Sequence, residues 1–187
     1  MNSLCTTATP VGVAMSGGVD STVAAATLLE QGFTVHGFFM KLPLPGIDEQ
    51  IDKVQAVADQ LGIPLHFVEL EEDFTQKVIA YFCEAYRQGQ TPNPCVVCNR
   101  LIKFGLLTQA MHAHGMEKTA SGHYVGREQR DNTVLLRRGK DSKKDQSYFL
   151  CRLAPEQLQH CLFPLADQTK FDEPVTDHTG VWGLPLA

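Results

Sequence analysis

A short apolar segment, followed at once by a glycine-rich turn and a helix-forming segment, constrains this 187-residue chain most strongly. Residues 11–15 read Val-Gly-Val-Ala-Met and predict a strand, and residues 16–21 read Ser-Gly-Gly-Val-Asp-Ser. The two glycines permit a tight turn and a close approach of the backbone to an anion, because neither carries a Cβ atom. The following segment, residues 22–26, begins a helix whose N–H groups and dipole favour that anion. The pattern predicts a phosphate-binding loop.

The side chains of this loop also fit phosphate chemistry. Ser16, Ser21 and Thr22 offer hydroxyl donors, and Asp20 is expected to orient a donor or to hold Mg²⁺. The loop is not a Walker loop, because no Gly-Lys-Ser/Thr follows at the required spacing. It resembles the pyrophosphatase loop, or PP-loop, of enzymes that cleave ATP between its α and β phosphates.

Strand and helix signals alternate along the first two thirds of the chain. We expect strands over residues 11–15, 33–40, 64–70 and 119–124, and helices over residues 21–31, 48–61, 73–89 and 99–115. This order predicts an α/β fold with a Rossmann-like parallel sheet and helices on both faces. Ligands in such sheets bind beyond the carboxyl ends of the strands, where Ser16–Ser21, Met40 and Gly122-His123 are expected to converge.

The pattern changes after Tyr124. A hairpin is expected over residues 125–127 and 133–138. We divide the chain into residues 1–150, a nucleotide-binding domain, and residues 151–187, a short C-terminal appendage. No apolar run approaches the roughly 18 residues of a membrane helix, and the N-terminus has no signal-peptide pattern, so we expect a cytoplasmic protein.

The charge is unevenly distributed. The whole chain has a formal net charge of −5, yet residues 100–152 carry 11 basic and 5 acidic side chains. This segment could present a cationic surface to a polyanion, or it could be an ordinary solvated face.

The cysteines include one close pair, in the segment Asn93-Pro94-Cys95-Val96-Val97-Cys98. Cys98 is expected at the start of the helix over residues 99–115, where the dipole, with Arg100 and Lys103, would lower the pKa of its thiol and make it a nucleophile. A zinc site is disfavoured, because no second close pair of ligands follows. An iron–sulfur site built from Cys95 and Cys98 with Cys151 or Cys161 stays open. Cys83, on the helix expected over residues 73–89, is predicted to be a core residue.

Ordered motifs along nearly the whole chain resemble those of the tRNA-specific 2-thiouridylases of the MnmA type. They span residues 14–21, 91–99, 102–104, 121–124, 141, 144–150 and 163–165. The resemblance implies a PP-loop fold of the adenine nucleotide alpha hydrolase type. It also implies an activity in which ATP adenylates the C2 oxygen of the wobble uridine of tRNA, and a cysteine persulfide, loaded by a sulfur-relay protein, then supplies sulfur.

The resemblance also implies a role for each matching residue. Cys98 would be the catalytic nucleophile, with Asp20 as the second catalytic residue. ATP, with Mg²⁺, would bind at Ala14, Met15, Ser16, Gly17, Gly18, Val19, Asp20, Ser21, Met40 and Gly122. Asn93, Pro94 and Cys95 would face the target base, and Lys144, Asp145 and Gln146 would contact the tRNA.

The match ends at Gly183–Ala187, where members of that family continue into a second catalytic cysteine and further tRNA-gripping domains. Two explanations fit: a shortened relative that binds nucleotide without full turnover, or a replacement of the second thiol by Cys95, Cys151 or Cys161. A PP-loop enzyme that adenylates another substrate, and a nucleotide- or tRNA-binding module without turnover, are the alternative functions. The tRNAs used, the sulfur donor and the oligomeric state cannot be read from these residues.

Overall fold

The computed structural model describes residues 8–169, and within them the chain forms a five-stranded parallel sheet and a two-stranded hairpin. The strands are β1 Pro10–Met15, β2 Thr34–Lys41, β3 Leu65–Glu69, β4 Lys118–Ser121, β5 Val125–Arg130, β6 Thr133–Arg138 and β7 Cys161–Leu162. The helices are α1 Val19–Glu30, α2 Ile47–Leu61, α3 Glu71–Phe74, η1 Thr75–Ile79, α4 Ala80–Arg87, α5 Pro94–Cys98, η2 Asn99–Leu107, α6 Thr108–Ala113, η3 Ser147–Leu150 and α7 Pro155–Gln159.

The order of the strands in the sheet is β3-β2-β1-β4-β7. The chain therefore moves outward from β1 to β3 and then returns to place β4 on the other side of β1. A sheet of this kind has its ligand crevice where the order reverses, outside the carboxyl ends of the two central strands. Here that crevice lies between the ends of β1 and β4, directly beside the glycine-rich loop.

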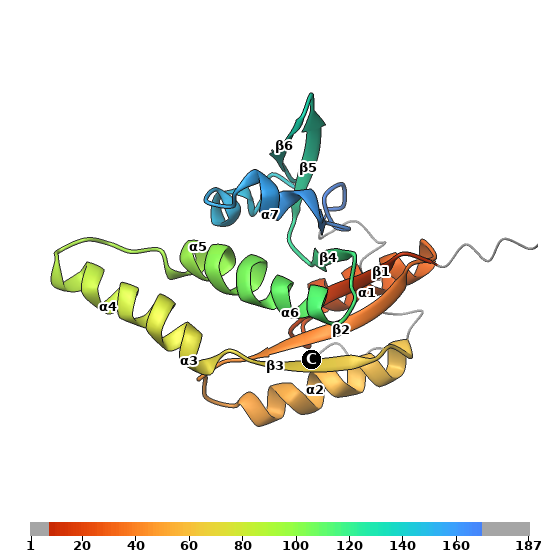
Figure 1. Cartoon of the computed structure of the whole chain (residues 1–187), viewed down its shortest axis with the longest axis horizontal. Coiled ribbons are helices and arrows are strands. Elements are labelled where there is room, and N and C mark those ends of the chain that lie inside the picture. The colour runs from red at the N-terminus through yellow and green to blue at the C-terminus, as the bar shows by residue number, and fades with distance from the viewer. Residues whose placement is uncertain (1–7, 170–187) are drawn as a thin grey trace, which may run out of the picture.

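Helices cover both faces of the sheet, which confirms the predicted fold class (Figure 1). Alternate side chains of the central strands explain the two layers, because successive residues of a strand point to opposite faces. Val35 and Phe39 of β2 pack with α1 and α2 on one face. Phe38 packs with η1, η2 and α6 on the other face.

The helix that carries the cysteine pair begins five residues earlier than predicted. Pro94 opens α5, and the carboxamide oxygen of Asn93 accepts a hydrogen bond of 3.3 Å from the N–H of Val96. Asparagine is a favoured N-cap and proline is favoured in the first turn, so the sequence contained this signal. The helical run then continues through η2 and α6 to Ala113, and the expected start at Asn99 is wrong.

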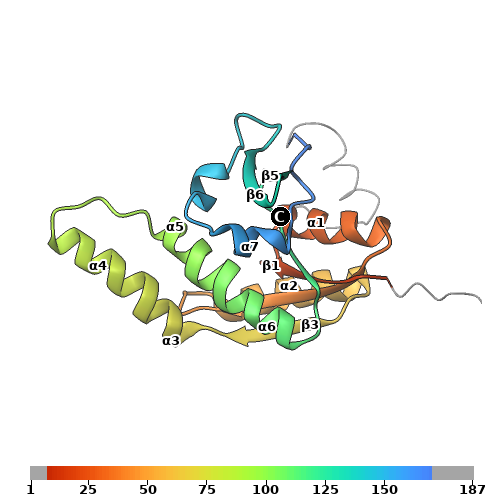
Figure 2. The ribbon, with the colours of Figure 1, turned by 45° about the horizontal axis from the view of Figure 1, so that its top comes forward.

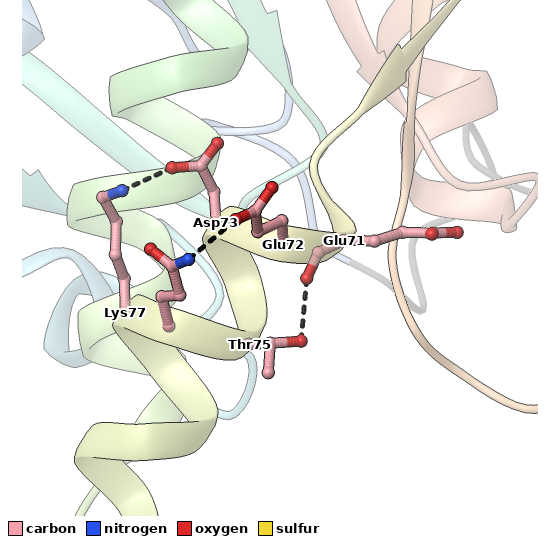
Figure 3. Close-up of polar contacts among 6 residues, drawn as sticks. Glu71, Glu72, Asp73, Thr75 and Lys77 are labelled. Carbon is pink, nitrogen blue, oxygen red and sulfur yellow. Dashed lines mark hydrogen bonds and ion pairs between the residues drawn. The ribbon is translucent and has the colours of Figure 1, made fainter.

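An arm formed by α3, η1 and α4 extends away from the sheet (Figures 1 and 2). Its first turns are held by contacts between residues four apart, shown in Figure 3: the Thr75 hydroxyl donates to the Glu71 carbonyl at 2.8 Å, and Lys77 pairs with Asp73. Because the arm leaves the sheet, much of α4 stays in water, and the prediction that Cys83 is a core residue is wrong: its side chain is exposed.

The segment after the sheet's fourth strand forms a third hydrophobic cluster. The β5–β6 hairpin is present as predicted and turns at Asp131, whose φ of 51° lies in the left-handed region. Val125 and Val134 of the hairpin pack with Leu158 of α7 and with Cys161 of β7. β7 follows the expected boundary at residue 150 and pairs with β4. Residues 170–187 of the proposed appendage, including Gly183–Ala187, lie outside the described residues, and the division at residue 150 stays a prediction.

Within residues 8–169, none of the helices combines the length and the apolar character needed to cross a membrane.

Candidate nucleotide and thiol site

The glycine-rich loop connects β1 to α1 in a tightly bonded turn. Gly17 has a φ of +73°, a conformation that glycine adopts without strain. The Ser21 hydroxyl donates to the Gly18 carbonyl at 2.9 Å and accepts from the Ser16 N–H at 3.3 Å. Among the described side chains, none caps the N-terminus of α1. Its first N–H groups therefore keep their capacity to bind an anion.

A cavity of about 190 Å³ lies at this N-terminus. It is lined by residues from the ends of three parallel strands, from the start of α1, from η2 and from the residue before η3: Ala14, Met15, Ser16, Asp20, Ser21, Met40, Lys103, Ser121, Gly122, His123 and Gln146. The structure thus brings together seven of the ten residues expected to bind ATP. Gly17, Gly18 and Val19 form the turn beside the cavity and are not among its lining residues. The Thr22 hydroxyl donates to the Gly18 carbonyl at 3.0 Å, and the Ser21 hydroxyl donates to the same carbonyl at 2.9 Å, so neither hydroxyl supplies the expected phosphate donor in this structure.

Gly122 holds the end of β4 against the start of α1. A Cβ atom built on Gly122 would lie 2.6 Å from the carbonyl carbon and oxygen of Asp20 and 2.8 Å from the nitrogen of Ser21. A second link joins the same elements, because the Tyr124 hydroxyl donates to the Asp20 carboxylate at 3.2 Å. Burial raises the pKa of Tyr124, and the nearby Asp20 raises it further, so the hydroxyl keeps its proton. Asp20 is therefore fixed in position at the cavity wall.

A second cavity, of about 390 Å³, lies beside the cysteine pair. Its walls are mostly apolar and come from the arm, from α5 and η2, and from η3: Phe74, Val78, Pro94, Cys95, Cys98, Asn99, Lys103, His123, Gln146 and Phe149. A cavity of this size, with apolar walls and a few convergent polar groups, is typical of a small-molecule or base site. The sequence placed Asn93, Pro94 and Cys95 against the target base, and Pro94 and Cys95 line this cavity. Phe74 and Val78 come from a segment predicted only as a helix, and Phe149 comes from the motif over residues 144–150, where no site role was assigned to it.

The two cavities share Lys103, His123 and Gln146. These side chains form the boundary between the loop that is expected to hold phosphates and the thiol that is expected to act as nucleophile. The nucleotide cavity and the Cys98 cavity are therefore neighbours, although residues 16 and 98 are far apart in the sequence.

Cys98 does not have the environment that the sequence predicted. It lies one turn inside the helix rather than at its N-terminus, which begins at Pro94. Burial raises the pKa of the Cys98 thiol above its ordinary value, while Lys103 opposes this shift and Cys95 adds to it. The expected lowering of the Cys98 pKa is therefore wrong, because the dipole acts at the end of a helix and desolvation disfavours a thiolate. Of the two cations named from the sequence, Arg100 is exposed and lines neither cavity.

His123 is held as a neutral ring at the boundary. Burial lowers the pKa of His123 to about 3, and the charge of Lys103 contributes to this. Its Nδ1 lies 2.8 Å from the Ser121 hydroxyl oxygen, which fixes the orientation of the imidazole.

Two of the three residues predicted to contact tRNA, Asp145 and Gln146, accept hydrogen bonds from other parts of the protein. The Asp145 carboxylate accepts hydrogen bonds from the Gly139 N–H at 3.0 Å and from the Ser147 hydroxyl at 2.8 Å. Burial acts to raise the pKa of Asp145, but these hydrogen bonds outweigh burial and lower it. The Gln146 side-chain oxygen accepts from the Tyr124 N–H at 3.0 Å. Lys144 is exposed, and contact of these residues with tRNA stays a prediction.

Of the other described thiols, Cys83, Cys151 and Cys161 line neither cavity. Cys151 is exposed, and Cys161 is buried, where its thiol donates to the Gln157 carbonyl at 2.9 Å. Burial raises the pKa of Cys161 to about 11. In the described part of the chain, no three His, Cys, Asp or Glu side chains are grouped so that they could hold a metal ion, so Cys95 and Cys98 are not joined there by Cys151 or Cys161.

The chain is similar in sequence to known proteins. The family described as "tRNA methyl transferase HUP domain" matches residues 9–176. Proteins named tRNA-specific 2-thiouridylase MnmA from Desulfotalea psychrophila and Syntrophotalea carbinolica are 48% and 47% identical to the chain, over 85% and 94% of it. The matches span 46% and 51% of those relatives, so the chain corresponds to about half of their length.

Among solved structures, a predicted subunit of tRNA methyltransferase from Methanocaldococcus jannaschii aligns with a TM-score of 0.49 at 16% identity, over 92% of this chain and 74% of that one. The family match covers most of this sequence, including the loop, the cysteine pair and the segment after β4. The chain belongs to the tRNA methyl transferase HUP-domain family.

Proposed function

We propose that this chain forms the part of a cytoplasmic tRNA 2-thiouridylase that binds ATP, adenylates the wobble uridine and presents a sulfur nucleophile. The observation that carries the proposal is the shared wall of the two cavities, formed by Lys103, His123 and Gln146. A reaction that first activates a carbonyl with a nucleotide and then attacks it with sulfur needs the two sites in contact.

The smaller cavity would hold the phosphates of ATP. The uncapped start of α1 supplies N–H groups and the positive end of the dipole, and Ser16 lines the wall. Asp20 is the carboxylate at this wall, and it fits Mg²⁺, which usually binds through one or two carboxylates together with phosphate oxygens. When bound there, Mg²⁺ would neutralise charge that develops on the departing pyrophosphate.

The larger cavity would hold the target base. Phe149 and Phe74 offer apolar and aromatic surface of the kind on which unstacked RNA bases pack. Uridine O2 is a poor leaving group until adenylation converts it into part of AMP. A persulfide on Cys98, loaded by a sulfur-relay protein, would then attack C2, and AMP would leave from the side of the smaller cavity.

The basic segment that contains Lys144 would bind the tRNA backbone. Phosphate contacts of this type position a nucleic acid rather than read its sequence. The exposure of Lys144 supports this role, whereas Asp145 and Gln146 would act by fixing the loop that carries it.

The proposal is tested by measuring release of AMP and pyrophosphate from ATP with unmodified substrate tRNA. We expect tRNA-dependent release that Asp20→Ala abolishes and that Cys98→Ser retains, because the serine variant keeps the adenylation site and loses only the sulfur nucleophile. Absence of ATP binding at millimolar concentration would refute the nucleotide assignment. ATP binding and tRNA binding without release of pyrophosphate would instead identify a binding module.

A further inference from the structure

Lys103, which the sequence placed only near Cys98, lies between the two cavities. It lines both cavities and is half-buried, on a helix whose other cation, Arg100, points to solvent. None of the six ion pairs found within residues 8–169 involves Lys103. A cation at a cavity wall without a carboxylate partner is positioned to receive an anionic ligand.

The local helix geometry explains how Lys103 reaches the Cys98 cavity. In an α-helix, residues five apart lie about 140° apart around the axis, so Cys98 and Lys103 would diverge. The turns over Asn99–Leu107 are π-helical, and in that geometry the hydrogen bonds join residues five apart. The wider turn brings Lys103 to the side of the helix that carries Cys98, and both line the larger cavity.

We propose that Lys103 is a positioning residue shared by the two sites, whose ammonium holds a phosphate of the nucleotide on one side and the anionic sulfur of Cys98 on the other. The phosphate half of this inference rests on the proposed function, and the sulfur half does not. Both halves have the same electrostatic basis, since a partly desolvated cation interacts more strongly with an anion than an exposed one does.

The directions of the pKa shifts of Lys103 and Cys98 agree with the position of Lys103 beside Cys98. Burial lowers the pKa of Lys103, while Cys98 and Cys95 act to raise it. Lys103 in turn acts to lower the pKa of Cys98 against the larger effect of burial. An anion that enters the smaller cavity would therefore favour the protonated lysine.

The sulfur half is tested by the pH dependence of alkylation with iodoacetamide, resolved by peptide mass spectrometry. In Lys103→Gln we expect the pH profile of Cys98 alkylation to move to higher pH. In Lys103→Arg, which keeps a positive charge, we expect this profile to move less. Cys83, exposed on α4, serves as the internal control whose profile stays fixed. An unchanged Cys98 profile in Lys103→Gln would overturn this half, and because the readout needs neither ATP nor tRNA, it does not depend on the proposed function.

The phosphate half is tested by titration calorimetry with ATP and with inorganic pyrophosphate. We expect Lys103→Gln to weaken ATP binding by about tenfold or more, the range for one charge-assisted hydrogen bond. Lys118→Gln is the matched control, because Lys118 begins β4 at the opposite end of the strand from the cavity. Equal ATP affinity in Lys103→Gln and the wild type would refute the shared role, whereas failure of the wild type to bind ATP would refute the nucleotide assignment itself.

Discussion

Gly122→Ala tests whether the end of β4 is pressed against the loop that we assign to phosphate. The added methyl group would lie 2.6 Å from the carbonyl atoms of Asp20, where ordinary contacts between heavy atoms begin at about 3.5 Å. The atoms in the way belong to the backbone, so rotation of a side chain cannot relieve the overlap of roughly 0.9 Å. The backbone of Gly122 lies outside the left-handed region, which leaves this overlap as the main cost.

Overpacking of this kind typically costs about 1–3 kcal/mol of unfolding free energy. The lower conformational entropy of unfolded alanine offsets at most about 1 kcal/mol of that cost. Because backbone atoms are in the way, we expect the upper end of this cost, which leaves about 2 kcal/mol after the offset. With a urea m-value of about 2 kcal/mol per molar, the midpoint should then fall by about 1 M while the slope stays the same. Because the displaced atoms belong to Asp20 and Ser21, ATP binding should weaken in parallel.

Gly18→Ala is the matched control in the same loop. Gly18 has a φ of −90°, and the nearest atom to an added Cβ is the Ser16 hydroxyl oxygen at 3.4 Å. Alanine fits there, so the urea midpoint should stay within error or rise slightly. Equal midpoints for Gly122→Ala and Gly18→Ala would contradict the close approach of β4 to α1.

Three further predictions follow from single contacts. The pKa of His123 is about 3 in the folded protein and about 6.5 in the unfolded chain. The contribution of neutral His123 to the free energy of unfolding is therefore complete above pH 6.5 and is lost as the pH falls toward 3, with a slope of at most about 1.4 kcal/mol per pH unit. In His123→Gln, the urea midpoint should fall less between pH 7 and pH 5 than in the wild type. Asp145→Asn should speed amide hydrogen exchange at Gly139 and Ser147, since their N–H groups donate to its carboxylate at 3.0 and 3.2 Å, and unchanged exchange would contradict that loop geometry. Lys77→Ala should change stability by no more than about 0.5 kcal/mol, because its pairing with Asp73 is a surface contact within one helix.

Sequence reasoning identified the sheet and the loop because both depend on local patterns. Apolar strands, a glycine-rich turn and helical spacing fixed the order of the elements, and parallel connection then required Ser16, Met40 and Gly122 to meet at one edge. These residues do line one cavity. The positions of the strand ends alone place these residues at one edge, whatever contacts their side chains make.

The site was predicted less well where its geometry depends on packing between distant segments. The arm of α3, η1 and α4 leaves the sheet, so helical periodicity alone wrongly placed Cys83 in the core. Phe149 reaches the Cys98 cavity from η3, more than fifty residues after Cys98. Lys103 was expected to act on Cys98, but its place on the wall of the smaller cavity was not predicted, and the π-helical turns that carry it leave no mark in residue spacing.

The placement of Cys98 explains why a side chain, rather than a helix terminus, must stabilise the Cys98 thiolate. The start of α1 is uncapped and can bind a phosphate, but the start of α5 is capped by Asn93 and lies a full turn before Cys98. Burial then disfavours the thiolate, and Lys103 is the cation that acts against it. Burial of the same lysine lowers its own pKa, and a nucleotide anion in the smaller cavity would raise that pKa again by favouring the protonated form. The two sites would thus be coupled through one proton. At any pH where Lys103 is partly deprotonated in the free protein, ATP binding to the wild type should be accompanied by proton uptake that Lys103→Gln lacks, which calorimetry in buffers of different ionisation enthalpy, repeated across the pH range, measures directly.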